Sequence, residues 1–422
     1  MSSPQFKILF FRFSLPDLIP TFGKTPKTAN HSTIFCLLPM FFLLLAMATA
    51  SASDQGDFRT APIDHQGKKW RIGYLEGGNY NDYIPVLKST LSFLAKMGWL
   101  ENADNECLKQ ASKTRDIWNC LSADQSNHFL EFVSDAYWSA DWNEEKRSKN
   151  KADFLNRANR VKDIDLMIAM GTWAGQDLAN NDHGVPTIVL STSNAYASGI
   201  IKSPEDSGFD HVHARVDPTR YARQVRLFHE IVKFKKMGMV LEDTVEGRSY
   251  SGLDQIETVA KERGFEIIKC HASFSGVDLT AAEKAVVDCH QELAPKIDAM
   301  YITIHRGVTE RNMARLLAPL FKHKIPNFTM GTLYEVHYGA MMSMAQPNFD
   351  YAGKFYAQTI AKIFNGAKPR NISQILEDPQ VICVNLLAAS LVGFDFPMDI
   401  LSGADQILKT IEEYKDPQQR KP

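Results

Sequence analysis

Short apolar runs alternate with longer helical patterns along most of this chain, and this alternation restricts the fold more than any other feature. The first strand-like run covers Arg71–Glu76, and a helical pattern over residues 85–97 follows it. Strands that alternate with helices of ten or more residues predict right-handed crossovers and parallel sheets. The same series predicts a helix over residues 143–161 and further strands over residues 129–133, 165–170 and 187–190.

The pattern restarts after Pro218 with a helix over residues 221–232. Four strands are expected over residues 237–241, 265–268, 299–304 and 326–330. Helices between them are expected over residues 252–261, 279–293 and 312–321. Each series has about 130 residues, a usual size for a domain. The sequence therefore predicts an α/β protein with two doubly wound lobes.

The C-terminal part departs from a simple row of two domains. It carries a strand pattern over residues 339–345, a helix over residues 349–364 and a strand over residues 381–384. These elements can return the chain to the first lobe, which makes the lobes discontinuous. We expect the first lobe to comprise residues 68–213 with part of 340–422, and the second to comprise 214–339 with part of 340–380.

An uncharged apolar run of fifteen residues, Ile34–Ala48, lies near the N-terminus. Basic residues precede it, and the small-residue sequence ATASAS follows it. This combination is typical of a secretory signal peptide, and we expect residues 1–52 to be removed by cleavage near Ala50 or Ala52. The alternative is a membrane anchor that stays in place, although the run is short for a hydrocarbon core of about 30 Å. We therefore expect a periplasmic or secreted protein.

The charge balance argues against a nucleic-acid partner. The full chain of 422 residues has a formal net charge of −2. The expected signal peptide holds four basic residues and one acidic residue, so the remainder carries −5. A protein that binds nucleic acid through bulk positive charge is thereby disfavoured.

Five cysteines remain after the expected cleavage, and an oxidising compartment permits disulfides between them. Proximity in the sequence favours the pairs Cys107–Cys120 and Cys270–Cys289, with Cys383 buried and free. Four cysteines allow three connectivities, so proximity alone does not decide between them. Cys270 and Cys289 are each followed by a histidine, and the alternative interpretation is a zinc site.

Candidate binding residues follow the predicted strands, because ligands in open α/β sheets bind beyond the carboxyl ends of the strands. Gly171–Gly175 follows one strand and opens a helix, whose N-terminus suits a carboxylate. The mixture of polar, aromatic and glycine residues at these positions fits a small polar ligand. Each residue also has a structural interpretation: glycines turn the chain, Thr172 and Ser249 can cap helices, and Arg306 can pair with a surface acid.

The order of these motifs resembles that of the substrate-binding proteins of ABC importers. It looks most like the subfamily that includes binders of aromatic and related amino acids. The resemblance covers nearly all of residues 70–405. It is carried by RIGYLEG at 71–77, DLMIAMGTWA at 165–174, VPTIVLSTSNAYASGII at 185–201, KKMGMVLED at 235–243, KIDAMYITIHRGVT at 296–309, KIPNFTMG at 324–331 and FYAQTIAKIFNGAKPRNI at 355–372.

The resemblance implies a type I periplasmic-binding fold, in which two Rossmann-like lobes are joined by three crossing segments. It implies that a small ligand is captured in the cleft by hinge closure and delivered to a membrane permease with a cytoplasmic ATPase. We expect a monomer without cofactor, metal or catalytic activity. The cleft positions implied are Tyr80, Asn81, Asp82, Thr172, Trp173, Ser193, Asn194, Asp243, Ser249, Arg306, Thr332 and Tyr334.

Three features depart from the family pattern. Ser193-Asn194 stands where members usually have Asp-Pro, and His305-Arg306 stands where many have Asp-Asn. An arginine in the cleft favours an acidic group on the ligand. The stretch over residues 101–141 is longer than usual, and we expect it to cap the cleft or cover an edge of the sheet.

Two other functions compete with import: ligand sensing and an exported enzyme. A sensing module would present its ligand to a receptor kinase. An exported α/β hydrolase is suggested by Gly247-Arg-Ser249-Tyr-Ser251, which narrowly misses the nucleophile-elbow pattern. A metal site is suggested by His211-Val-His213, which places two imidazoles on one face of a strand. That segment is expected to lie in or beside an interlobe crossing.

Overall fold

The computed structural model describes residues 58–331, 333–345 and 348–414. The expected signal peptide, residues 1–52, lies outside these described residues. Within them, no helix is both long and apolar enough to cross a membrane. Both lobes belong to one unit of the chain, Gln55–Pro422.

The first lobe is built on a five-stranded sheet with the order β2-β1-β3-β4-β5, in which every pair of neighbours is parallel. The strands β1 and β3 correspond closely to the predicted runs, and β2 extends six residues further than predicted. Buried apolar side chains cover both faces of the sheet, as a doubly wound lobe requires. The strands are β1 (Trp70–Glu76), β2 (Leu130–Ser139), β3 (Leu166–Met170), β4 (Thr187–Leu190) and β5 (Val212–Ala214).

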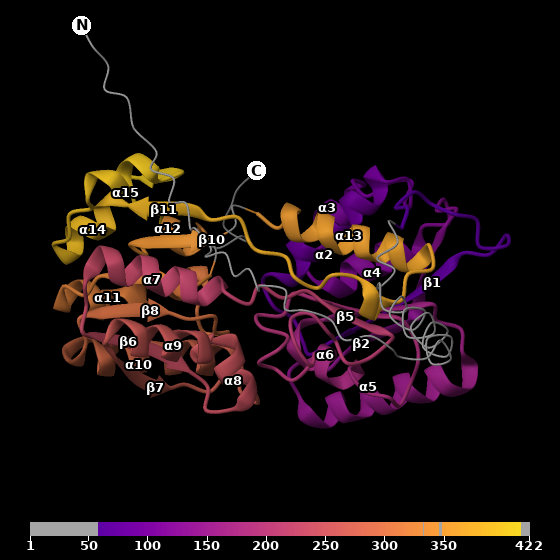
Figure 1. Ribbon diagram of the computed structural model, residues 1–422, viewed down its shortest axis with the longest axis horizontal. Coiled ribbons are helices and arrows are strands. Elements are labelled where there is room, and N and C mark those ends of the chain that lie inside the picture. Colours follow the sequence, from indigo (N-terminus) through magenta and orange to yellow (C-terminus); the bar gives the residue numbers. More distant parts are fainter. Residues whose placement is uncertain (1–57, 332, 346–347, 415–422) are drawn as a thin grey trace, which may run out of the picture. The chain divides into compact units, whose positions relative to one another are not determined.

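Helices of the first lobe come from two distant parts of the chain. Most lie between its strands: α2 (Tyr83–Lys96), α3 (Glu106–Gln110), α4 (Thr114–Ala123), α5 (Glu144–Asn156), continued by a π-helical turn over Arg157–Val161, and α6 (Gly171–Leu178). The remaining helix, α13 (Asp350–Phe364), returns from the C-terminal part and lies beside α2 (Figure 1). The two helices approach closely at Gly353, where a Cβ atom would lie 2.2 Å from the Ser89 Oγ.

The second lobe is built on a seven-stranded sheet with the order β12-β11-β10-β9-β8-β6-β7. All neighbours are parallel except β10 and β11, which are antiparallel. The strands are β6 (Lys236–Leu241), β7 (Glu266–His271), β8 (Ala299–Ile302), β9 (Asn327–Thr329), β10 (Met342–Ala345), β11 (Val381–Asn385) and β12 (Gln406–Leu408). The C-terminal strands thus join this second sheet, including β11 and β12 beyond residue 380, whereas α13 joins the first lobe.

Helices pack on both faces of the second sheet, where two apolar clusters are buried. They are α7 (Arg220–Val232), α8 (Val245–Tyr250), α9 (Leu253–Arg263), α10 (Leu279–Leu293), α11 (Met313–His323), α12 (Leu333–His337), α14 (Leu386–Val392) and α15 (Met398–Gly403). Short 3₁₀ turns cover Ala294–Lys296, Glu310–Asn312 and Pro369–Asn371.

The chain crosses between the lobes three times: after β5, between β10 and α13, and between α13 and β11. The first and third crossings pair with each other through an isolated parallel bridge between Val216 and Ile375. His213, in β5, is fully buried beside these crossings, and its Nε2 lies 3.1 Å from the carbonyl oxygen of Ser373. The first and third crossings therefore form a hydrogen-bonded hinge.

Both predicted disulfides are confirmed. Cys107–Cys120 joins α3 to α4, and Cys270–Cys289 joins β7 to α10. Cys383 is free and buried, as predicted. The zinc interpretation is wrong, because the sulfurs of Cys270 and Cys289 are bonded to each other. No group of three or more metal-ligating side chains occurs among the described residues.

Candidate functional site

A cavity of about 800 Å³ lies where the two lobes meet. Its walls come from loops that follow β1 and β4 of the first lobe and β8 and β9 of the second, together with α2, α3, α12, α13 and the hinge. The loops lie at the carboxyl ends of parallel strands, where α/β sheets bind ligands. Below, "the cavity" means this space.

Asp82 supplies a carboxylate to the cavity wall. It directly precedes α2, but its side chain makes no capping hydrogen bond to the helix. Burial raises the pKa of this carboxyl to about 6, and the Arg220 guanidinium opposes the rise. Across residues 58–331, 333–345 and 348–414, the Asp82 carboxylate has no hydrogen-bond or ion-pair partner. It is therefore available to a ligand cation.

Arg220 supplies a guanidinium to the same wall from the first residue of α7. Its Nε lies 3.4 Å from an Asp378 carboxylate oxygen, and Arg215 forms a second ion pair with that carboxylate. Arg215 and Asp378 come from the first and third crossings and also line the cavity. Two guanidiniums thus share one carboxylate, so these three side chains together carry a net positive charge.

Aromatic side chains complete the walls. Tyr80 packs edge-on against Tyr83 at 5.5 Å between ring centroids, and burial raises the pKa of the Tyr80 phenol well above its usual value. Tyr356 reaches the cavity from α13, and its hydroxyl accepts a hydrogen bond of 3.2 Å from the Ser191 backbone N–H. Phe349 and Tyr334 also line the space. The cavity therefore combines aromatic walls with charges of both signs.

Aromatic side chains form a second region of contact between the lobes, which we call the aromatic cluster. It comprises Trp142 and Trp173 of the first lobe with Tyr250, Phe274 and Arg306 of the second. Trp142 lies edge-on to Trp173 at 5.5 Å and to Phe274 at 5.6 Å. Phe274 in turn contacts Tyr250 at 4.8 Å. None of the five lines the cavity.

Arg306 lies in the aromatic cluster with its guanidinium 5.7 Å from the centre of the Trp142 ring. It donates hydrogen bonds of 2.9 and 3.0 Å to the carbonyl oxygens of Phe274 and Val277. Burial lowers the pKa of this guanidinium. Its donors are thus partly used by the protein itself.

Polar contacts between the lobes adjoin the aromatic cluster. The Ser249 hydroxyl donates to the Asn194 carbonyl oxygen at 3.1 Å and lies 2.5 Å from the Ser198 hydroxyl. Gln176 Nε2 donates to a Glu246 carboxylate oxygen at 3.0 Å. Ser249 is therefore buried in a contact between α8 and the loop after β4.

The structure brings four of the predicted site residues to the cavity: Tyr80, Asp82, Ser193 and Tyr334. It places Trp173 and Arg306 in the aromatic cluster, and Asn194 and Ser249 in the neighbouring polar contact. Asn81 and Asp243 are exposed, Thr172 is buried at the start of α6, and Thr332 lies outside the described residues.

Sequence reasoning missed the charged residues of the hinge. Arg215 and Asp378 are 163 positions apart in the chain, so no local pattern indicates that they meet. Arg220 directly precedes the helix predicted over residues 221–232, next to a predicted crossing, and this position was the available signal. Tyr356 lies in α13 and Phe349 directly precedes it. The aromatic side chains of the helix predicted over residues 349–364 were an indirect signal for these cavity residues.

In the described part of the chain, neither Gly247–Ser251 nor His211–His213 has the geometry of a catalytic or metal site. The hydrogen-bond partners of the Ser249 hydroxyl are Asn194 and Ser198, and no described histidine lies at hydrogen-bond distance from it. His211 packs against His183 with ring centroids 4.6 Å apart, while His213 points to the hinge. The three histidines therefore do not form one described metal-ligating group.

Comparison with known proteins supports the resemblance seen in the sequence. Residues 137–408, more than half of the chain, match the model of the family described as ABC transporter substrate binding protein. No curated protein sequence matches the chain.

Three solved structures have the same fold. In each comparison the match covers 81% of this chain and 100% of the other chain. One is a conserved domain protein from Vibrio cholerae, with 17% identity and a TM-score of 0.61. A second is an ABC domain from Streptococcus pneumoniae in complex with L-Trp, with 16% identity and a TM-score of 0.60. A third is the ligand-free, open structure of a substrate binding protein with adhesive properties from Clostridium difficile, with 18% identity and a TM-score of 0.52.

The structural similarity shows a shared fold, and the family match covers the second lobe and the first lobe from the end of β2 onward. The family model and the solved structures agree with the architecture described above. It has two doubly wound lobes, three crossings and an interlobe cavity at the carboxyl ends of the strands. The chain is a member of the ABC transporter substrate binding protein family and has the type I periplasmic-binding fold.

Proposed function

We propose that this protein captures a small zwitterionic ligand, an amino acid with an aromatic or apolar side chain, in the cavity between its lobes. The observation that carries the proposal is a pair of opposite charges in the walls of the cavity. Asp82 and Arg220 both line the cavity, and each influences the other electrostatically without forming an ion pair. An amino acid presents an ammonium and a carboxylate that fit between two such groups.

The remaining walls suit the rest of such a ligand. Tyr80, Phe349 and Tyr356 offer aromatic faces, and ligand sites of this size are mostly apolar with a few placed polar groups. The Streptococcus pneumoniae structure of the same fold holds L-Trp, which supports an aromatic amino acid as the first ligand to test.

The family match supports delivery to an ABC permease. We propose that the lobes close on the ligand about the three crossings and that a permease with a cytoplasmic ATPase accepts the closed complex. Ligand favours the closed state only as far as it binds that state better. A neighbouring gene for a receptor kinase, in place of permease and ATPase genes, would favour sensing. We propose no catalytic role.

We propose that the protein acts outside the cytoplasm, as a monomer, after cleavage of a signal peptide near Ala50 or Ala52. Its two disulfides support an oxidising compartment. The N-terminal sequence of the exported protein tests the cleavage: a start between Ser51 and Ser53 is expected, and an intact N-terminus in the membrane fraction would contradict it.

The central test is calorimetric titration of the wild type and Asp82→Asn with L-tryptophan, tryptamine and indole-3-propionate. We expect L-tryptophan to bind the wild type best, because only it presents both charges. Asp82→Asn should weaken L-tryptophan about 10- to 100-fold, since a hydrogen bond to a charged group contributes about 1.5–3 kcal/mol. It should leave indole-3-propionate, which lacks the ammonium, nearly unchanged.

Asp243→Asn is the matched control, because the Asp243 side chain is 85% exposed and does not line the cavity. Equal losses in both variants would show that the ammonium is not held at Asp82. If L-tryptophan does not bind, a thermal-shift screen of the twenty amino acids and small acids decides. A ligand at 100 Kd should stabilise the protein by about 2.7 kcal/mol. No shift across the screen would reject the amino-acid proposal.

A further inference from the structure

The short helix α3 forms one wall of the cavity. Asp104, Leu108 and Lys109 line the space from this segment, together with Ala103 just before it. Leu108 is buried, whereas Asp104 and Lys109 are exposed and their charged ends lie 3.5 Å apart. This wall belongs to the long stretch 101–141, which was expected to cap the cleft or cover an edge.

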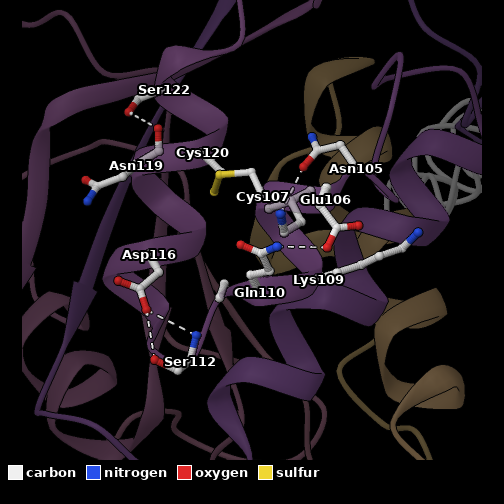
Figure 2. The surroundings of a disulfide bond; sticks show 12 residues. Asn105, Glu106, Cys107, Lys109, Gln110, Ser112, Asp116, Asn119, Cys120 and Ser122 are labelled. Atoms are coloured by element: carbon white, nitrogen blue, oxygen red, sulfur yellow. Dashed lines mark hydrogen bonds between the residues drawn. A yellow bond between two sulfur atoms is a disulfide. The ribbon is translucent and has the colours of Figure 1, made fainter. Parts of the chain in front are cut away.

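Leu108 packs into the buried core of the first lobe, but few polar contacts hold α3 in place. It has five residues, and a helix this short is not stable by itself. Asn105 caps it by accepting a hydrogen bond of 2.9 Å from the Leu108 N–H. Lys88 of α2 reaches the carbonyl oxygens of Lys109 and Ala111, both at a long 3.4 Å. The covalent connection is the disulfide between Cys107 and Cys120 of α4 (Figure 2).

Helix α4 is anchored without the disulfide. The Thr114 hydroxyl donates to the buried Glu76 carboxylate at 2.8 Å. The Trp118 ring is fully buried, and its Nε1 donates to the Val133 carbonyl oxygen at 3.0 Å. Ile117 is also fully buried. The disulfide therefore ties a weakly held cavity wall to a firmly held helix.

We propose that the Cys107–Cys120 disulfide positions α3 as a wall of the binding cavity, and that reduction of this disulfide releases the wall and weakens ligand binding. Cys107 is exposed and Cys120 is half-buried, so Cys107 is open to attack by a dithiol. The dithiol's thiolate bonds to the Cys107 sulfur, and the Cys120 sulfur leaves as a thiolate that takes up a proton. The second thiol of the reductant then displaces Cys107 and closes the reductant's own disulfide. Two electrons and two protons pass to the cysteines.

The second disulfide provides a matched control within the same chain. Cys270–Cys289 joins β7 to α10, and neither residue lines the cavity. Cys289 is buried. Removal of the Cys270–Cys289 disulfide should lower the melting temperature, as loss of a disulfide generally does. It should not change the cavity wall.

The experiment compares wild type, Cys107→Ser/Cys120→Ser and Cys270→Ser/Cys289→Ser by hydrogen–deuterium exchange and by titration with L-tryptophan. In the first variant, amides of residues 104–111 should exchange about tenfold faster or more, whereas those of residues 114–121 should keep their protection. L-Tryptophan affinity should fall about tenfold, because the binding-competent wall is populated only part of the time. The second variant should match the wild type in both readouts.

Unchanged exchange over residues 104–111 would overturn the inference, as would an equal loss of affinity in both variants. If the first variant does not fold, Cys270→Ser/Cys289→Ser treated with dithiothreitol provides the same two readouts, because Cys107–Cys120 is then the disulfide that remains to be reduced. The affinity readout rests on the proposed function, but the exchange readout does not. If the oxidised wild type binds no amino acid, the proposed function fails and exchange alone decides whether the disulfide holds the wall.

Discussion

The cavity and the aromatic cluster both lie where the lobes meet, yet they satisfy their charged groups in opposite ways. In the cavity, Asp82 has no partner in the described chain and Arg220 shares Asp378 with Arg215. In the aromatic cluster, Arg306 is held by two carbonyl oxygens and covered by Trp142. Position at the end of a strand therefore does not by itself make a charged residue a ligand contact: Arg306 follows β8, yet its guanidinium bonds to the protein itself.

The largest expected effect comes from replacing each of the two arginines in turn. Arg220→Ala should weaken a carboxylate ligand such as L-tryptophan about 10- to 100-fold, because a charge-assisted hydrogen bond is lost. Arg306→Ala should change the same affinity less than threefold, since Arg306 does not line the cavity. Titration of both variants with L-tryptophan and tryptamine separates the effects. A larger loss in Arg306→Ala would place the ligand at the aromatic cluster.

The pH dependence of ligand affinity tests whether the ionised Asp82 carboxylate holds the ligand. Its pKa of about 6 means that the carboxyl is mostly ionised above pH 6 and mostly protonated below it. An ammonium ligand needs the ionised form, so its affinity should be constant above about pH 7. It should fall by up to tenfold per pH unit below pH 6. Calorimetry between pH 4.5 and 8 measures this slope, and Asp82→Asn should abolish it. A slope that survives in the variant would show that another group titrates.

Buried histidines beside the aromatic cluster and at the hinge should affect stability rather than ligand binding. Burial lowers the pKa of His305, beside Arg306, to about 4. The unfolded chain has the higher histidine pKa, near 6.5, so it binds more protons between pH 6.5 and 4. The free energy of unfolding should therefore be largest above pH 6.5 and decline towards pH 4, by at most about 1.4 kcal/mol per pH unit for each such histidine.

Urea unfolding of His305→Gln against the wild type at pH 7.5 and 5 measures this contribution. The variant should lose less stability between the two pH values, because glutamine does not titrate. His213→Gln, at the hinge, is the comparison, since burial lowers the pKa of His213 to about 4 as well. Identical pH slopes in wild type and both variants would contradict a role for these buried imidazoles.

The smallest expected effect concerns the polar contact next to the aromatic cluster. Gln176 and Glu246 join the lobes by one hydrogen bond of 3.0 Å. A double-mutant cycle with Gln176→Ala and Glu246→Ala should give a coupling of about 0.5–1.5 kcal/mol in thermal stability. The coupling should be the same with and without L-tryptophan, because neither residue lines the cavity. A coupling that appears only with ligand would show that the two regions act together.

The strands were predictable because each core strand is a short run of buried apolar residues bounded by polar turns. The runs at β1, β3 and β6 carry this signal directly. Both disulfides followed from short separations in the sequence. The division of the C-terminal elements between the lobes was not predictable in detail, because the apolar patterns of α13 and β11 indicate a helix and a strand but not the lobe that each one joins.

The site was predictable only at the level of loops. Tyr80, Asp82, Ser193 and Tyr334 follow strands, and the rule about carboxyl ends of strands finds such residues. The rule does not tell which strand-end residues are used in packing: Trp173 follows β3 and packs against Trp142 from a different loop. Contacts such as Arg215 with Asp378 depend on the three-dimensional path of the hinge.

Helix α13 has a consequence for how the chain folds during synthesis. Its residues Tyr356, Ala357 and Ile360 share one buried cluster with Leu87 and Leu91 of α2. The first lobe is therefore missing part of its own core until the ribosome has also made the first five strands of the second sheet. Folding of the N-terminal lobe must wait for a segment that lies well over 200 residues downstream of α2, and long-range closure of this kind is slow. This delay agrees with the proposed export, because a chain that folds slowly stays unfolded longer.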